Sequence, residues 1–163
     1  MKILRLFPAA ALLASAFAPT LPAAELAGKK ALTLEIAKQV AAAAESFAAK
    51  NKWTMVITVV DDGGNVMFLE KMDETQLGSI EVAIEKAKSA VNFKRPTKAF
   101  EDIVVGGRNT VLKLPGSLPV EGGIPLMVDG KLLGAIGVSG GTSVQDGQTA
   151  TAAVDAFPKI IGR

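Results

Sequence analysis

The sequence contains no histidine, no cysteine and no tyrosine among its 163 residues. These absences remove the commonest acid–base group and metal ligand, the thiolate nucleophile and every disulfide. Acid–base chemistry would fall to aspartate, glutamate or lysine, and the sequence shows no convergent set of these residues. The composition therefore favours a binding protein over a strong catalyst.

Aromatic residues are also scarce, at 5% of the chain, and no basic patch with interleaved aromatics is present. Nucleic-acid binding consequently has no support. The whole chain carries 18 Lys and Arg against 16 Asp and Glu, and its first 24 residues hold Lys2 and Arg5 but no acid. Residues 25–163 are therefore balanced, with 16 basic residues (18 minus 2) against 16 acidic ones.

The first 24 residues have the order of a secretory signal. Residues 1–5 include two basic side chains, 6–18 are almost purely apolar, and prolines followed by Ala23 and Ala24 come next. The apolar run is shorter than the ~20 residues that span a bilayer, although a retained membrane anchor is the alternative interpretation. We expect cleavage next to Ala23 or Ala24, export to the periplasm or the extracellular space, and no stable membrane anchor afterwards.

Residues 25–163 are predicted to form a single domain. Apolar residues at three- and four-residue steps predict one helix over 33–51 and another from Gly78 that must stop before Pro96. Thr97 is well placed to cap a shorter third helix, and a last helix is expected over 144–160.

Two β-hairpins are predicted between these helices, one around the turn Asp61–Asn65 and one around Asp129–Gly130. Residues 120–123 suggest a further short strand end, which gives the element order α-β-β-α-α-β-β-β-α. Because hairpins dominate over crossover units, the sequence predicts an α+β fold with a mainly antiparallel sheet and flanking helices.

Several motifs follow one another in an order that resembles a known family. They are Gly78–Ala87 (GSIEVAIEKA), Phe93–Thr97 (FKRPT), Gly122–Pro125 (GGIP), Gly134–Gly141 (GAIGVSGG) and Gln145–Asp146. This succession resembles the GlcG/HbpS family, also called the haem-degrading domain, which includes the C-terminal domain of PduO-type proteins. The similarity runs from about residue 32 to residue 157.

The resemblance implies a five-stranded antiparallel sheet of the profilin-like or PAS-like kind, and a homo-oligomer. It also implies haem or a corrinoid as the ligand, iron as a further cofactor, or a role beside glycolate metabolism without an assigned reaction. Some family members are thought to ligate haem iron through a histidine, which this chain lacks. Thr97 is the candidate counterpart of a threonine proposed as the axial ligand in another branch. The methionines are softer candidate ligands, but those at 55, 67, 72 and 127 lie in or beside predicted strands, where a structural role is favoured.

The turn from the last predicted strand into the last helix is a candidate ligand site. Unshielded N–H groups at a helix start can hold a carboxylate, so Gly140, Gly141 and Thr142 are predicted to bind an acidic ligand. The alternative is purely structural, because Ser143 with Asp146 three residues later approximates a capping box.

Arg95 and the Gly122–Gly123 pair complete the predicted ligand site. The Arg95 guanidinium is suited to hold a carboxylate in bidentate fashion, with a solvated helix end or an intersubunit ion pair as the alternative. Two glycines before a strand suggest a bulge, or a place where a ligand comes near, and they are expected to form the opposite lip of a pocket from Gly140–Gly141.

Glu81 and Glu85 are four residues apart and therefore share one face of the second helix. A family member carries a metal-binding pair of acids on a helix, so the resemblance implies a weak iron or divalent-metal site here. Lys88 offers Glu85 an alternative partner.

The leading hypothesis is an exported, homo-oligomeric protein that binds haem or a related tetrapyrrole. The alternative is an enzyme or accessory protein that acts on small hydroxy or oxo acids such as glycolate. A third hypothesis is a structural assembly module without a ligand.

Overall fold

The computed structural model of the chain describes residues 24–163. The predicted basic start and apolar run of the secretory signal lie outside the described residues. Among residues 24–163, no helix is both long enough and apolar enough to cross a membrane.

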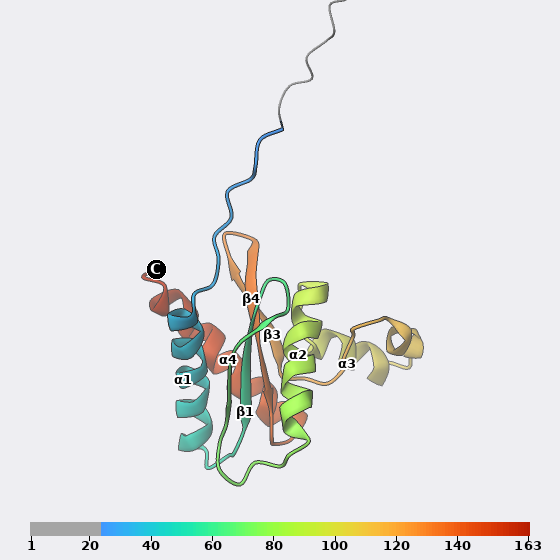
Figure 1. Cartoon of the computed structure of the whole chain (residues 1–163). Coiled ribbons are helices and arrows are strands. Elements are labelled where there is room, and N and C mark those ends of the chain that lie inside the picture. Colours follow the sequence, from blue (N-terminus) through green and yellow to red (C-terminus); the bar gives the residue numbers. More distant parts are fainter. Residues whose placement is uncertain (1–23) are drawn as a thin grey trace, which may run out of the picture.

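The domain consists of one sheet with helices on both of its faces (Figure 1). Its elements follow in the order α1 (Leu34–Lys50), β1 (Val56–Asp61), β2 (Val66–Lys71), α2 (Ser79–Phe93), α3 (Lys98–Val105), the 3-10 helix η1 (Asn109–Lys113), β3 (Gly123–Val128), β4 (Lys131–Ser139) and α4 (Ser143–Ile160). The described strands form a sheet in the order β2-β1-β4-β3, in which every neighbouring pair is antiparallel. The predicted antiparallel α+β fold and both predicted hairpins are thus confirmed.

The first hairpin turn is held by one carboxylate. Oδ1 of Asp61 accepts hydrogen bonds from the backbone N–H groups of Gly63, at 2.8 Å, and Asn65, at 2.9 Å. A side chain that bonds its own backbone two residues on is the usual reason for aspartate in such turns.

The two faces of the sheet are covered differently. α1 and α4 pack together on one face, where alternate residues of the central strands, among them Ile57, Val59, Ile136 and Val138, join the larger apolar core. α2 covers the other face and approaches β4 so closely that a Cβ atom at Gly137 would lie 2.0 Å from the backbone oxygen of Ala83. The alanines of α2 that contact the sheet are what permits this approach.

The predicted fifth strand is wrong, since the sheet has four strands in the described residues. Residues 120–122 lie outside the ladder, because Gly122 adopts a φ of 128° and the N–H of Glu121 donates to the carboxylate of Glu101 instead of to a strand. One backbone bond, from Val138 N to Gly122 O at 2.9 Å, joins this segment to β4 before β3 begins.

The segment of α3 and η1 projects sideways from the body of the domain (Figure 1). α2 ends at Phe93, ahead of Pro96 as predicted, and Lys94 takes a left-handed conformation with a φ of 50°. Thr97 stands at the start of α3 but makes no side-chain cap there, so that prediction is wrong; its hydroxyl accepts a hydrogen bond from the N–H of Gly123 instead.

Candidate functional site

A buried ion pair lies between α2 and the start of α4. Nζ of Lys86 is 2.6 Å from Oδ2 of Asp146 and donates to the carbonyl of Val138 at 3.0 Å. The two side chains are 1% and 4% exposed. Burial raises the pKa of the Asp146 carboxyl, against the opposite effect of Lys86 and of nearby backbone N–H groups.

The glycines predicted to bind a ligand surround this ion pair. A Cβ at Gly122 would lie 2.9 Å from Nζ of Lys86, and one at Gly123 would lie 2.2 Å from the Lys86 carbonyl oxygen. On the other side, the N–H of Gly141 donates to Oδ1 of Asp146 at 3.0 Å. The structure therefore places both glycine pairs against the same ion pair, and protein atoms fill the space next to them.

Backbone N–H groups of the turn into α4 already donate hydrogen bonds to side chains of the protein. The N–H of Thr142 donates to the side chain of Gln145 at 2.9 Å, and the N–H of Gln145 donates to the hydroxyl of Thr142 at 3.3 Å. The capping box is therefore Thr142 with Gln145, and the predicted box of Ser143 with Asp146 is wrong, because the Asp146 carboxylate faces Lys86. The ligand-binding role of Gly140, Gly141 and Thr142 stays a prediction, and it requires the bonds of Gly141 and Thr142 to open.

Thr97 and Arg95 differ sharply in their surroundings. Thr97 is fully buried, and its backbone and hydroxyl both bond Gly123. Arg95 is exposed, with its Nε donating to the carbonyl of Phe93 at 3.3 Å and its guanidinium 5.5 Å from the ring centre of Phe100. Among residues 24–163 the Arg95 guanidinium has no carboxylate partner, so it is the predicted site residue most open to an acidic ligand.

Within the described residues, no further ligand joins Glu81 and Glu85 at the predicted metal site on α2. Glu81 and Glu85 are both exposed, and a carboxylate oxygen of Glu85 lies 3.0 Å from Nζ of Lys88, which is the alternative partner expected from the sequence. Within the described part of the chain, no three His, Cys, Asp or Glu side chains gather in a way that would hold a metal ion.

The methionines are mostly structural. Met55 is fully buried in the larger core, and Met67 and Met72 pack against it. Met127 is exposed on the edge strand β3.

Lys86 and Asp146 were not predicted as partners. A signal was present: Lys86 follows Ala83 by three residues and precedes Ala90 by four, so it occupies the otherwise apolar face of α2. A charge on that face indicates a buried partner. Sequence spacing did not show which acid, 60 residues further on, would supply it.

Fold and site together define an α+β domain whose four-stranded antiparallel sheet is covered on both faces and whose last helix is tied to α2 by a buried ion pair. The chain belongs to the HbpS-like family, since the sequence model of that family, described as "Haem degrading protein HbpS-like", matches residues 32–155.

Individual relatives agree with this assignment. The protein GlcG of Escherichia coli K12 is 39% identical over 111 residues, which are 68% of this chain and 83% of GlcG. The crystal structure of a double Glu-to-Asp variant of Streptomyces reticuli HbpS is 31% identical, with a TM-score of 0.74, over 91% of this chain and 98% of that one. The crystal structure of a PduOC:heme complex is 31% identical, with a TM-score of 0.71, over 78% of this chain and 95% of that one.

Proposed function

We propose that this protein binds haem or a related tetrapyrrole. The observation that carries the proposal is the match to the haem-degrading HbpS-like family over residues 32–155, together with the similarity to a structure solved as a haem complex. Both cover most of the described domain.

The side chains fit the acidic edge of haem better than its iron. Arg95 offers an exposed guanidinium beside half-buried Phe93, and Lys94 next to it is also exposed. A guanidinium can bind a propionate carboxylate through two parallel hydrogen bonds. Imidazole, thiolate and phenolate ligands are missing from the sequence, and the Thr97 hydroxyl is buried against Gly123. We therefore expect haem to be held through its propionates and ring, with weak axial ligation.

Hemin titration of residues 25–163, followed by the Soret band, tests the proposal. We expect a saturable shift in the wild-type chain and an affinity about fivefold lower in Arg95→Ala, since one partly solvated ion pair contributes up to ~1 kcal/mol. Arg108→Ala is the matched control, because Arg108 is also an exposed arginine beyond α2. It should leave the affinity unchanged.

Three outcomes contradict parts of this proposal. A wild-type chain that leaves the Soret band unshifted would reject haem binding. Equal affinities in Arg95→Ala and the wild type would reject the role of Arg95, and equal losses in both arginine variants would show a general charge effect. Thermal stabilisation by glycolate or glyoxylate, without any response to hemin, would favour the small-acid function instead.

We also propose that the protein is exported and that its first 24 residues are removed. The order of basic, apolar and small residues before Glu25 supports this proposal. Cell fractionation with mass spectrometry of the purified chain is the test. A product that keeps Met1–Ala24 and stays in the cytoplasm would refute it.

A further inference from the structure

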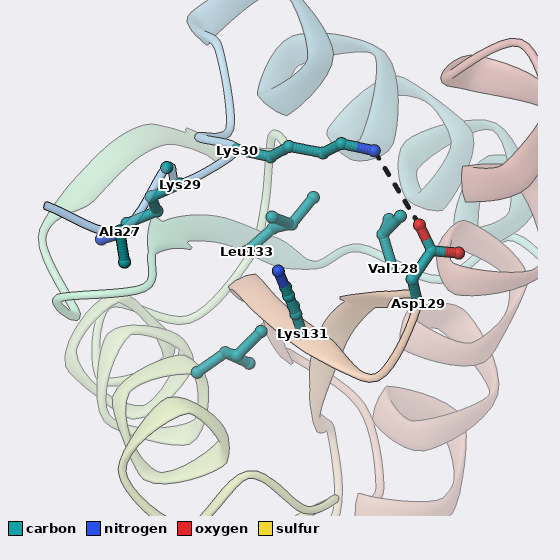
Figure 2. A pocket seen from close by; sticks show the side chains of 9 residues that line it. Ala27, Lys29, Lys30, Val128, Asp129, Lys131 and Leu133 are labelled. Atoms are coloured by element: carbon teal, nitrogen blue, oxygen red, sulfur yellow. Dashed lines mark ion pairs between the residues drawn. The ribbon is translucent and has the colours of Figure 1, made fainter. Parts of the chain in front are cut away.

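We propose a second ligand site, for an organic carboxylate with a short apolar body, in a pocket at the hairpin end of the sheet (Figure 2). The pocket has a volume of about 610 Å³ and lies between the β3–β4 hairpin and the extended residues that precede α1. This volume lies within the range of sites that enclose small organic molecules.

The wall on the hairpin side is apolar. Val128 and Leu133 are largely buried members of the main core, and Leu132 is half-buried against the α2 side of the sheet. Leu132 keeps the most exposed apolar surface of the three, and an aliphatic chain placed against it removes apolar surface from water on both partners. This wall gives the pocket an affinity for the body of a ligand.

Three lysines surround the apolar wall. Lys29 and Lys30 come from the segment before α1, and Lys131 is the first residue of β4. In Figure 2, Lys30 reaches from that segment toward Asp129 in the hairpin turn, and Lys131 rises from the start of β4. Cations placed over an apolar wall favour an anion whose remaining surface is apolar.

The three lysines differ in how closely a carboxylate approaches them within the described residues. Lys29 pairs with Asp62, and no carboxylate lies within 4.0 Å of Lys131. Nζ of Lys30 forms an ion pair with Oδ2 of Asp129 at 3.8 Å, the dashed line in Figure 2, but this distance is too long for a hydrogen bond.

Asp129 is bound more closely by another residue. Its two carboxylate oxygens accept hydrogen bonds from Arg163 at 2.6 and 2.8 Å. This bidentate contact holds the pKa of the Asp129 carboxyl below its ordinary value. Lys30 and Lys131 consequently keep donors for an incoming carboxylate.

The site is independent of the haem proposal, because it shares no residue with Arg95, Thr97 or the glycine turn. The probe is hexanoate, which combines one carboxylate with a short aliphatic chain. Acetate keeps the charge without the chain, and hexylammonium keeps the chain with the opposite charge.

The experiment is a two-dimensional amide NMR titration of residues 25–163, which hold every helix and strand described. We expect hexanoate to shift the amide signals of residues 27–31 and 128–133, with a Kd on the order of 1 mM. Acetate and hexylammonium should give no saturable shifts there. The double variant Lys30→Gln/Lys131→Gln should bind hexanoate about fivefold more weakly. The matched control Lys50→Gln/Lys113→Gln, at two exposed lysines outside the pocket, should bind as the wild type does.

Hexanoate shifts that are absent, or that fall elsewhere on the domain, would overturn the proposal. Unchanged binding in Lys30→Gln/Lys131→Gln would overturn it as well, since the lysines would then not hold the carboxylate. Hemin binding by the same sample tests the haem proposal separately, so either proposal can fail alone.

Discussion

Lys86 occupies a position on α2 where the neighbouring buried residues are mainly alanines, and it reaches Asp146 and the Val138 carbonyl from there. Removing two charges from water is costly, so such a pair stabilises a fold only when both partners are present. The contact joins α2, β4 and α4 at one point. The geometry of the turn into α4 therefore depends on this ion pair.

Replacing Lys86 by methionine should lower the free energy of unfolding by about 3–5 kcal/mol, because Asp146 is left buried and unpaired. The measurement is urea denaturation followed by circular dichroism. The matched control is Lys88→Met on the same helix, where an exposed pair with Glu85 is lost. That change should cost no more than about 0.5 kcal/mol.

The double variant Lys86→Met/Asp146→Asn separates charge from packing. It should be more stable than Lys86→Met alone, since no carboxylate remains without its cation. Equal stability of Lys86→Met and Lys88→Met would contradict the importance of the buried pair.

Glu70 on β2 gives a pH-dependent prediction. It is half-buried, its Oε1 has no hydrogen-bond partner among the described residues, and burial followed by the nearby Glu45 charge raises the pKa of its carboxyl. Below the ordinary pKa of glutamate, Glu70 is protonated in both the folded and the unfolded state. As pH rises toward the raised value, the unfolded state loses its proton first, so this group makes stability fall with increasing pH.

Glu70→Gln should therefore stabilise the protein at pH 7 and change little at pH 4. The gain should stay below about 1 kcal/mol because solvent screens this half-buried group. Thermal unfolding at the two pH values measures the effect. A gain that is larger at pH 4 than at pH 7 would contradict the assigned direction.

At the scale of elements, the packing of α2 on β4 depends on Gly137. A side chain there would collide with the backbone of Ala83 and with Ala87. Gly137→Ala should cost at least about 3 kcal/mol or prevent folding, because the helix must move off the sheet. Gly78→Ala, before the same helix and with no atom within 4 Å of the new methyl group, should change stability by less than about 0.5 kcal/mol. Thermal unfolding of both variants measures the difference in stability. Similar melting temperatures would show that α2 can move off β4 without loss of stability.

The start of α4 offers a second test at this scale. Thr142→Ala should lose about 1 kcal/mol of unfolding free energy, since Thr142 carries the capping bond to Gln145. Ser143→Ala should lose clearly less, since its hydroxyl only contacts Glu101 at 3.3 Å. Chemical denaturation of the two variants compares them, and the reverse order would restore the capping box that the sequence suggested.

Local patterns predicted most elements but not the contacts between distant ones. Helical periodicity and the turn at Asp61–Asn65 act over a few residues, so α1, α2 and the hairpins followed from the sequence. The expected strand at 120–123 failed because Glu101, about 20 residues away, takes the N–H of Glu121. The capping box was misplaced for the same kind of reason, since a lysine 60 residues away engages Asp146.

At the scale of the whole molecule, the projecting α3–η1 segment is a candidate contact surface between copies of the chain. Val105 and Leu112 on this segment are 81% and 53% exposed. Exposed apolar side chains that gather on one protrusion often mark an interface between proteins. We propose that this segment contacts a second copy of the chain in a homo-oligomer.

Light scattering coupled to size-exclusion chromatography should give a mass that is a multiple of the chain mass. Val105→Asp/Leu112→Asp should reduce that mass, because a charge at an apolar contact opposes association. Leu77→Asp is the control, since Leu77 is also highly exposed but lies in the loop before α2. A wild-type protein with the mass of one chain would contradict the proposal.

The paired hydrogen bonds from Arg163 to Asp129 fasten the last residue of the chain to the β3–β4 turn, at the end of the domain that the chain also enters (Figure 1). An affinity tag or fluorescent fusion attached directly to Arg163 would add bulk beside Lys30 and Asp129. Such a fusion would distort the hexanoate titration even in a correctly folded protein. Labels and surface attachments belong instead in the loop around Leu77, before α2.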